Sequence, residues 1–196
     1  MFSGIIETMG KLQQVESHGE NLRFLINCVL VPELKVDQSI AHNGVCLTVE
    51  AVHSDVYQVT AVAETLRKTN LHLLQPGHLI NLERSVTLQT RLDGHLVQGH
   101  ADTTARCTAL TEAGGSWEFT FAHEPGPTHL IVEKGSVTVN GISLTAFNVS
   151  PGQFSVAIIP YTFEHTNLHL LKPKDLVNIE FDLIGKYVAT VLQRQR

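Results

Sequence analysis

The chain has 196 residues, of which 43% are hydrophobic and 17% charged, enough to bury one sizeable core or two modest ones. The formal net charge of −5 and the lack of any Lys/Arg block disfavour a nucleic-acid-binding protein, which needs a concentrated basic face. No apolar run approaches the roughly 18 residues of a membrane span, and MFSGIIETMGKL lacks the features of a signal peptide. We therefore expect a cytoplasmic protein with no membrane partner. The three cysteines lack CxxC spacing and are expected to be reduced thiols: Cys28, Cys46 and Cys107.

Runs that predict β-strands occupy most of the chain. In the first half they cover residues 4–15, 22–30, 45–52, 56–63 and 79–83; in the second they cover residues 95–110, 116–122, 137–149, 154–160 and 176–182. One short helical insert is expected in each half, at residues 64–71 and 161–168. The sequence therefore predicts an all-β fold class.

The two halves repeat one another at a constant offset of 97 residues. TNLHLLQPGHLINLE (69–83) and TNLHLLKPKDLVNIE (166–180) share ten of fifteen positions, and SIAHNGVCLTV (39–49) matches SVTVNGISLTA (136–146). A period this long that occurs only twice indicates two homologous domains rather than a solenoid. Each match carries an Asn-Gly pair between β-rich runs, which is a strong hairpin signal.

Five or six strands in about 95 residues is the size of a small Greek-key barrel. We predict two tandem six-stranded β-barrels, at residues 1–93 and 94–184, followed by a short C-terminal helix at residues 185–196. On that helix Tyr187, Val188, Val191 and Leu192 form one apolar stripe. The stripe packs on its own barrel or meets copies of itself in an oligomer, and both alternatives remain open.

Eight motifs in order and register resemble those of the riboflavin synthase family: MFSGIIE, NGVCLTV, ETLRKTNL, INLER, GHLVQGHAD, KGSVTVNGISLT, IPYT and VNIEFD. The resemblance implies a dismutation in which two molecules of 6,7-dimethyl-8-ribityllumazine bind side by side and one gives a four-carbon unit to the other. Riboflavin and 5-amino-6-ribitylaminouracil result. A reaction between two copies of one molecule needs two similar pockets, which gives the duplication a chemical reason.

The family resemblance also implies a homotrimer, with the active site between the N-terminal barrel of one subunit and the C-terminal barrel of its neighbour. It implies neither a metal nor a cofactor. The sequence agrees, because it contains no HExxH motif, no CxxC motif and no phosphate-binding glycine loop.

Four residues are expected to carry the chemistry: Ser39, Cys46, His100 and Asp182. Strand alternation places Cys46 and Thr48 on one face, and the matching face of the second repeat carries Ser143 and Thr145. Asp182 stands where the first repeat has Ser85, so it breaks the symmetry between donor and acceptor. His95 and His100 are five apart, which puts them on opposite faces of a regular strand and makes them a poor metal pair. His95 is therefore interpreted as structural.

The resemblance implies further substrate-binding residues. Beside Cys46 these are Gly4, Ile5, Ile6, Leu47, Thr48, Thr60, Ala61, Val62, Ala63, Glu64, Thr65, Gly99, His100, Ala101, Lys134, Ser143, Leu144, Thr145, Ile158, Ile159, Pro160, Tyr161, Thr162 and Phe163. Helix capping is the alternative role for Thr65 and Thr162, and Tyr161 departs from the family pattern. Glu83, Glu180, Asn81 and Asn178 are assigned to the fold.

A non-enzymatic alternative is a lumazine-binding antenna protein, which shares the tandem-barrel fold and holds one chromophore. Such relatives depart from the enzyme in the second pocket and in the GHxVxGH segment. Both regions stand intact in this sequence, so the enzyme is the favoured interpretation.

Overall fold

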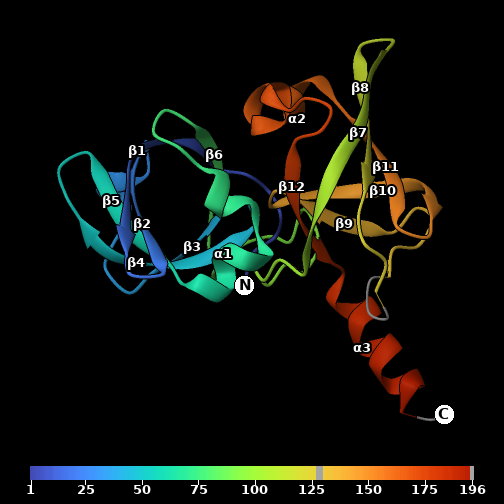
Figure 1. The fold of residues 1–196 in the computed structure, drawn as a ribbon, viewed down its shortest axis with the longest axis horizontal. Helices are drawn as coiled ribbons and strands as arrows, with labels where there is room; N and C mark the ends of the chain where they lie inside the picture. Colours follow the sequence, from blue (N-terminus) through green and yellow to red (C-terminus); the bar gives the residue numbers. More distant parts are fainter. Residues whose placement is uncertain (127–129, 195–196) are drawn as a thin grey trace.

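The computed structural model describes residues 1–126 and 130–194. Two closed six-stranded antiparallel barrels lie side by side, and a C-terminal helix projects from the second of them (Figure 1). The predicted all-β fold of two tandem six-stranded barrels with a short C-terminal helix is therefore confirmed.

Both barrels have the same strand order. In the order of their pairing, the strands of the first barrel are β1 (Thr8–His18), β2 (Asn21–Asn27), β5 (Val56–Ala61), β4 (Val45–Val52), β3 (Ser39–His42) and β6 (Leu79–Arg84). Their counterparts are β7 (Thr103–Ala113), β8 (Ser116–Ala122), β11 (Gln153–Ile158), β10 (Ile142–Ser150), β9 (Ser136–Val139) and β12 (Leu176–Phe181). The last strand pairs back onto the first in each, which removes every open sheet edge.

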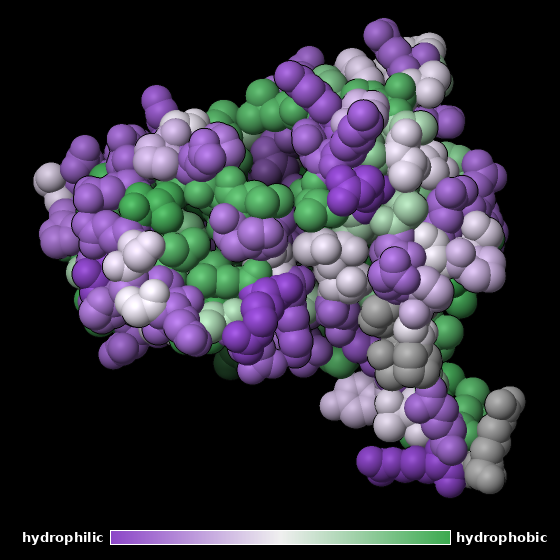
Figure 2. Space-filling model, in the orientation of Figure 1, coloured by the Kyte–Doolittle hydropathy of each residue, from purple (hydrophilic) through white to green (hydrophobic). Residues whose placement is uncertain are grey.

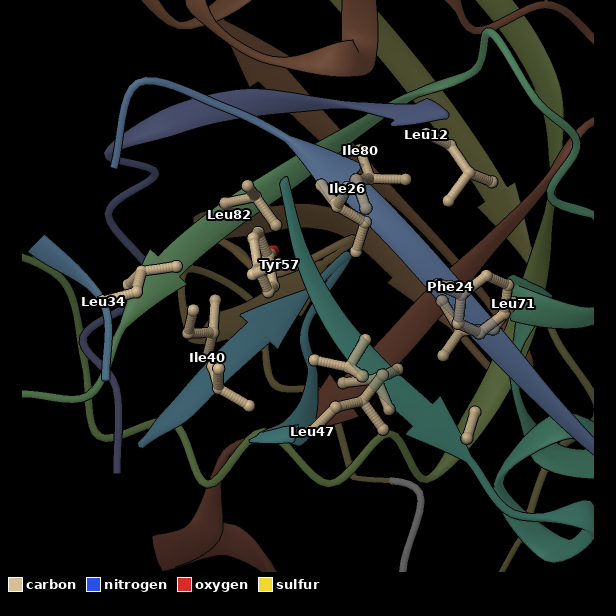
Figure 3. Close-up of a cluster of buried hydrophobic side chains, with 14 of the residues drawn as sticks. Leu12, Phe24, Ile26, Leu34, Ile40, Leu47, Tyr57, Leu71, Ile80 and Leu82 are labelled. Atoms are coloured by element: carbon tan, nitrogen blue, oxygen red, sulfur yellow. The ribbon is translucent and has the colours of Figure 1, made fainter. Parts of the chain in front are cut away.

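Each barrel encloses its own hydrophobic core. In β5 the inward positions Tyr57, Val59 and Ala61 are fully buried while the intervening residues reach the outside, which is the two-residue period of a half-buried strand. Figure 3 shows the first core, where side chains from several strands converge in the interior. The second core is more aromatic, because Phe119, Phe121 and Phe154 pack together there.

The two Asn-Gly pairs form the hairpins that the sequence predicts. Asn43 and Gly44 join β3 to β4 with φ angles of 47° and 77°, and Asn140 and Gly141 join β9 to β10 with 46° and 82°. Positive φ at both central residues is the signature of a type I′ turn. These turns fix the register of β4 and β10, the strands that carry the predicted pocket residues.

The same two turns meet at the junction of the barrels. A Cβ atom built on Gly44 would lie 2.7 Å from the backbone nitrogen of Gly141, and the reverse distance is also 2.7 Å, so both positions require glycine. Asn81 donates to the carbonyl of Asn140, and by the repeat symmetry Asn178 donates to the carbonyl of Asn43. The duplicated asparagines thus hold one barrel against the other, as expected for residues assigned to the fold.

Each half carries its helical insert after the fifth strand. The inserts are α1 (Ala63–Lys68) with the 3-10 helix η2 (Asn70–Leu73), and α2 (Pro160–His165) with η3 (Asn167–Leu170); a further 3-10 turn, η1 (Val31–Glu33), precedes β3. The N-cap residues of α1 and α2 are Val62 and Ile159, so the capping role considered for Thr65 and Thr162 is wrong. The threonines that cap are Thr69 and Thr166, which accept from the backbone at the start of η2 and η3.

The strand predicted over residues 95–110 begins only at Thr103. The preceding residues turn irregularly, with Gly99 at a φ of 80°, and Phe2 and Val97 form an isolated bridge there. The argument that alternation separates His95 from His100 therefore does not apply. Likewise, the first strand begins at Thr8 rather than at Gly4.

The C-terminal helix α3 (Leu183–Gln193) begins two residues before the predicted bound, because Asp182 caps it by accepting from the backbone N–H of Ile184 at 2.9 Å. Residues 195 and 196 lie outside the described residues. The side chains of the apolar stripe are between 52 and 67% exposed, so the stripe does not pack on its own barrel. Hydrophobic atoms reach the surface along this projecting helix (Figure 2).

Candidate active site

Of the predicted pocket residues on β4 and β10, four lie on the outer faces of the barrels, whereas Leu47 is buried in the first core and Leu144 packs against the second. Cys46 and Thr48 point outward while Val45, Leu47 and Val49 are buried, which confirms the alternation expected from the sequence. Ser143 and Thr145 occupy the same two outward positions of β10. The two repeats therefore present equivalent small polar groups.

Two irregular segments cover these positions, and each is held against both barrels. The backbone N–H of Cys46 donates to the carbonyl of Gly99 at 2.8 Å, and the N–H of Ser143 donates to the carbonyl of Gly4 at 2.8 Å. Ala101 packs on the first core and Ile6 on the second. Residues 99–101 thus lie against the first barrel at Cys46, and residues 4–6 against the second barrel at Ser143.

Both contacts depend on glycine. Gly4 and Gly99 have φ angles of 78° and 80°, which favour glycine. A Cβ atom on Gly4 would lie 2.6 Å from the Cβ of Ser143, and one on Gly99 would lie 2.8 Å from the Cβ of Cys46. The paired segments and strands therefore define two clusters, the Cys46 cluster (residues 46–48 and 99–101) and the Ser143 cluster (residues 143–145 and 4–6).

One buried glutamate anchors each covering segment. Glu180 accepts hydrogen bonds from the backbone N–H groups of Gln98, Gly99 and His100 at 2.6, 2.9 and 2.9 Å. Glu83 accepts from the backbone and hydroxyl of Ser3 and from the backbone of Gly4. Burial raises the pKa of both carboxyl groups, against the opposing effect of these hydrogen bonds. These two glutamates were assigned to the fold, and their structural role is to hold in place the segments that cover the two clusters.

His100 and Ser39 lie at the Cys46 cluster. The backbone of His100 is fixed on Glu180 while its imidazole is exposed. Ser39 pairs with Thr48 across the β3–β4 ladder, on the same outer face as Cys46. Ser39 and Ile5 both line a cleft of about 510 Å³ whose wall includes Arg84, and Arg84 is itself bound by Glu7 and Glu33. Three of the four residues expected to carry the chemistry therefore share one region.

Asp182 directly follows β12 of the second barrel. It caps α3, and its charge partly offsets the lowering of the His95 pKa by burial. In the described part of the chain, no hydrogen bond or ion pair joins Asp182 to Cys46, Ser39 or His100. Asp182 belongs to the second barrel, two residues after Glu180, whose carboxylate accepts from the backbone of His100.

His95, interpreted as structural from the sequence, lies at the Ser143 cluster. Its Nδ1 is 2.7 Å from the Oγ of Ser143, and its Nε2 is 3.2 Å from the Oγ1 of Thr138. Burial lowers the pKa of His95, with Asp182 acting in the opposite direction. Neither repeat comparison nor spacing pointed to this contact, because residues 94–100 belong to no regular element.

The remaining predicted residues lie on neighbouring strands, turns and helical inserts, except that Ala61 and Ile158 are buried in the barrel cores. Thr60 donates to Glu50 on the outer face beside β4, and Glu64 forms an exposed ion pair with Lys68. Lys134 sits in a turn with a φ of 63°, with its ammonium 5.4 Å from the ring centre of Phe147. In α2 the ring of Tyr161 stacks on His165 and that of Phe163 on Trp117. The residues before the two inserts, Ala61 to Ala63 and Ile158 to Pro160, follow from strands paired with β4 and β10.

All three cysteines are thiols, as expected. Across residues 1–126 and 130–194, no three His, Cys, Asp or Glu side chains gather in an arrangement that could hold a metal ion. Nor does any helix within those ranges have the length and apolarity needed to cross a membrane.

A family model described as the lumazine binding domain matches the chain twice, over residues 3–85 and 98–182. The riboflavin synthase of Actinobacillus pleuropneumoniae is 38% identical over 196 residues, covering 100% of this chain and 91% of the relative. That of Bacillus subtilis (strain 168) is 35% identical, covering 99% and 91%, and that of Mycobacterium tuberculosis (strain ATCC 25618 / H37Rv) is 39% identical, covering 98% of each. The chain belongs to the riboflavin synthase family.

Solved structures share the architecture of this family member. LumP complexed with 6,7-dimethyl-8-(1'-D-ribityl) lumazine superposes with a TM-score of 0.83 at 20% identity, covering 92% of this chain and 99% of that one. LumP complexed with riboflavin gives 0.84 at 20% identity, covering 92% and 98%. At this level of identity the likeness shows the tandem-barrel fold alone.

Proposed function

We propose that this chain catalyses the dismutation of two 6,7-dimethyl-8-ribityllumazine molecules to riboflavin and 5-amino-6-ribitylaminouracil. The observation that carries the proposal is the pair of equivalent clusters, in which Gly99 covers Cys46 as Gly4 covers Ser143. A reaction between two identical molecules needs two similar sites, and full-length relatives of this chain are riboflavin synthases.

Residues of the two clusters have different roles in the proposed reaction. Removal of a proton from the C7 methyl group of one lumazine requires a base, and the exposed imidazole of His100 beside the Cys46 cluster suits that role. Cys46, Ser39 and Thr48 offer small polar groups to the ring on the same face. Ser143 and Thr145 receive the second lumazine, and Lys134 and the α2 residues close that pocket. No metal or cofactor has a part in this scheme.

We further propose that the active site forms between subunits of a homotrimer in the cytoplasm. Asp182 follows β12 in the second barrel and, among the described residues, forms no hydrogen bond with Cys46, Ser39 or His100; in the proposed trimer, a neighbouring subunit supplies the second barrel's groups to the Cys46 cluster. The exposed stripe of α3 supplies an apolar contact for such an assembly. The division at residues 1–93, 94–184 and 185–196 remains our proposal for the two binding domains and the assembly helix.

The direct test is purified protein incubated with 6,7-dimethyl-8-ribityllumazine as the only substrate. We expect long-wavelength absorbance to grow, with one riboflavin formed for every two lumazines consumed. A chelator should leave the rate unchanged. Tight binding with altered fluorescence but no riboflavin over hours would instead support the antenna protein.

The Cys46→Ala and His100→Ala variants are expected to fold normally and to lose most turnover, by roughly a hundredfold or more for the proposed base His100, because each removes a polar group from the pocket without opening a core cavity. Cys46→Ser should be milder, since it keeps a small polar atom in place. Steady-state rates together with thermal unfolding measure both effects. Wild-type rates in both alanine variants would show that the Cys46 cluster is not the site.

Deletion from Lys186 onward is expected to weaken the homotrimer, because it removes Tyr187, Val188, Val191 and Leu192 from the surface. The deletion also breaks the Lys186–Asp102 ion pair, so Lys186→Ala serves as the control for that loss. Analytical ultracentrifugation at several concentrations compares the three proteins. One common mass for truncated and intact chains would exclude the helix as the trimer contact.

A further inference from the structure

His95 links a pocket hydroxyl to a buried hydroxyl. Its ring lies between Ser143 on β10 and Thr138 on β9, at 2.7 and 3.2 Å. The segment approaches closely because residue 94 is glycine, where a Cβ would clash with the carbonyl oxygen of Ser3 and lie 2.9 Å from the Cβ of Ser143. The backbone N–H of His95 donates to that same carbonyl at 3.1 Å. Hydrogen bonds thus hold both the main chain and the side chain of His95.

The Cys46 cluster has no equivalent of this arrangement. Cys46 replaces Ser143 and Ala41 replaces Thr138 in the first repeat, so neither partner hydroxyl exists there. In the described part of the chain no hydrogen bond reaches the thiol of Cys46, and the nearby imidazole of His100 is exposed. The two clusters share their backbone geometry and differ in how the outward polar group is oriented.

A neutral imidazole has one N–H and one lone pair, so it donates to one hydroxyl and accepts from the other. Because burial lowers the pKa of His95, the ring is neutral near pH 7. Thr138 is almost fully buried and holds one side of the ring, so the other side holds the Ser143 Oγ in one position in either tautomer. A hydroxyl that is oriented before the ligand arrives binds it without losing rotational freedom on binding.

We propose that His95 is a positioning residue of the second pocket, which orients the Ser143 hydroxyl to bind the ring of one of the two lumazine molecules. The inference rests on the proposed function and deepens it, because it makes the Ser143 pocket the pre-organised one of two otherwise similar pockets. The identical substrates are then distinguished by the pocket that holds them.

Two near-isosteric substitutions of His95 distinguish the hydrogen bond made by Nδ1 from the one made by Nε2. An asparagine at position 95 brings an amide near the place of Nδ1 and keeps a partner for Ser143, whereas a glutamine brings it near the place of Nε2 and keeps one for Thr138. The test compares His95→Asn, His95→Gln, His95→Leu, Ser143→Ala and the double variant His95→Leu/Ser143→Ala. Riboflavin is the probe, since without the uracil product it has no partner with which to react, and its fluorescence quenching reports each binding site.

We expect His95→Leu and His95→Gln to weaken one riboflavin site roughly tenfold, the effect of one hydrogen bond, and to leave the other site unchanged. His95→Asn should stay within about threefold of wild type. In the double variant, loss of His95 should add less than about twofold to the loss from Ser143→Ala, because the two act through one contact. The unchanged site and thermal unfolding control for misfolding.

Three results would overturn the proposal: wild-type affinity in His95→Leu, equal loss in the asparagine and glutamine variants, or independent, multiplying losses in the double variant. A riboflavin site that Ser143→Ala does not weaken would overturn it as well. These binding results are separate from turnover. If wild-type protein forms no riboflavin from lumazine, the proposed reaction fails while the role of His95 in binding is still decided.

Discussion

Replacement of Glu180 by alanine is expected to lower the free energy of unfolding by about 3–5 kcal/mol and to abolish most turnover. Its carboxylate is almost fully buried and accepts from three consecutive backbone N–H groups, those of residues 98 to 100. A buried donor left without a partner costs about 1–3 kcal/mol, and entering water recovers part of that cost. Because the same segment covers Cys46 and carries His100, loss of its anchor also displaces the proposed base.

Glu83→Ala should have a similar effect at the other segment, since Glu83 accepts from the backbones of Ser3 and Gly4 and from the Ser3 hydroxyl. Glu50→Ala is the matched control: this exposed carboxylate also accepts two hydrogen bonds, but from the side chains of Gln58 and Thr60. We expect it to cost less than about 1 kcal/mol. Urea unfolding gives the free energies, and backbone hydrogen exchange shows which segment loosens.

If exchange in residues 98–100 is unchanged in Glu180→Ala, water or another group satisfies these donors and the anchor role is wrong. Loosening of residues 3 and 4 in the same variant would mean that the two segments are coupled through the Phe2–Val97 bridge. The Glu83→Ala variant tests that coupling from the other side.

Local sequence signals predicted the barrels well. Alternating residues such as those of β4 and β5 report which face of a strand is buried, and the Asn-Gly turns fix the neighbouring register without reference to the rest of the chain. The duplication added a second copy of each signal. These are short-range properties, so a sequence shows them directly.

The arrangement of residues 1–7 and 94–102 could not be predicted from local sequence signals. These segments have no period, and their course is set by contacts with Glu83, Glu180, Cys46 and Ser143, which are distant in the sequence. Reading residues 95–102 as strand was therefore wrong, and the place of His95 beside Ser143 was missed. The Gly-His pairs at positions 94–95 and 99–100 were the sequence feature that could have indicated this irregular segment, because a glycine within a strand-like run often marks a bulge or a close backbone approach.

The cores of the two barrels also differ at two equivalent positions. The repeat alignment gives the residue pairs, but only the structure shows that all of them are buried. Position 42 is histidine in the first barrel and its counterpart is Val139, while Tyr57 corresponds to Phe154, and all four side chains are buried. His42 Nδ1 donates to the carbonyl of Ile40 at 3.0 Å, and its Nε2 accepts from the Tyr57 hydroxyl at 2.8 Å. The first barrel thus contains a hydrogen-bonded polar pair where the second has only hydrocarbon.

This pair is expected to make the first barrel sensitive to acid. Burial lowers the pKa of His42 to about 4 from an ordinary value of 6.5. Between these values the unfolded chain binds one proton more than the folded barrel, so stability falls as the pH falls from 6.5 to 4. The shift corresponds to about 3 kcal/mol, which is fully lost at pH 4 and fully retained above pH 6.5. The raised pKa values of Glu83 and Glu180 act in the opposite direction.

The second barrel supplies the variant that isolates His42. In His42→Val/Tyr57→Phe both partners are replaced by the residues of the other repeat, so neither side chain leaves the other unpaired; only the Ile40 carbonyl loses a donor, and stability near pH 7 should change little. Either single substitution leaves one partner unsatisfied and should cost about 1–3 kcal/mol. The measurement is hydrogen exchange of β3 and β5, with β9 and β11 of the same molecule as the internal reference. Between pH 6.5 and 4, the free energy of opening of the first barrel should fall by about 3 kcal/mol more in the wild type than in the double variant. Because the two glutamates titrate equally in both proteins, their contribution cancels, and parallel pH profiles for wild type and double variant would show that His42 does not control acid stability.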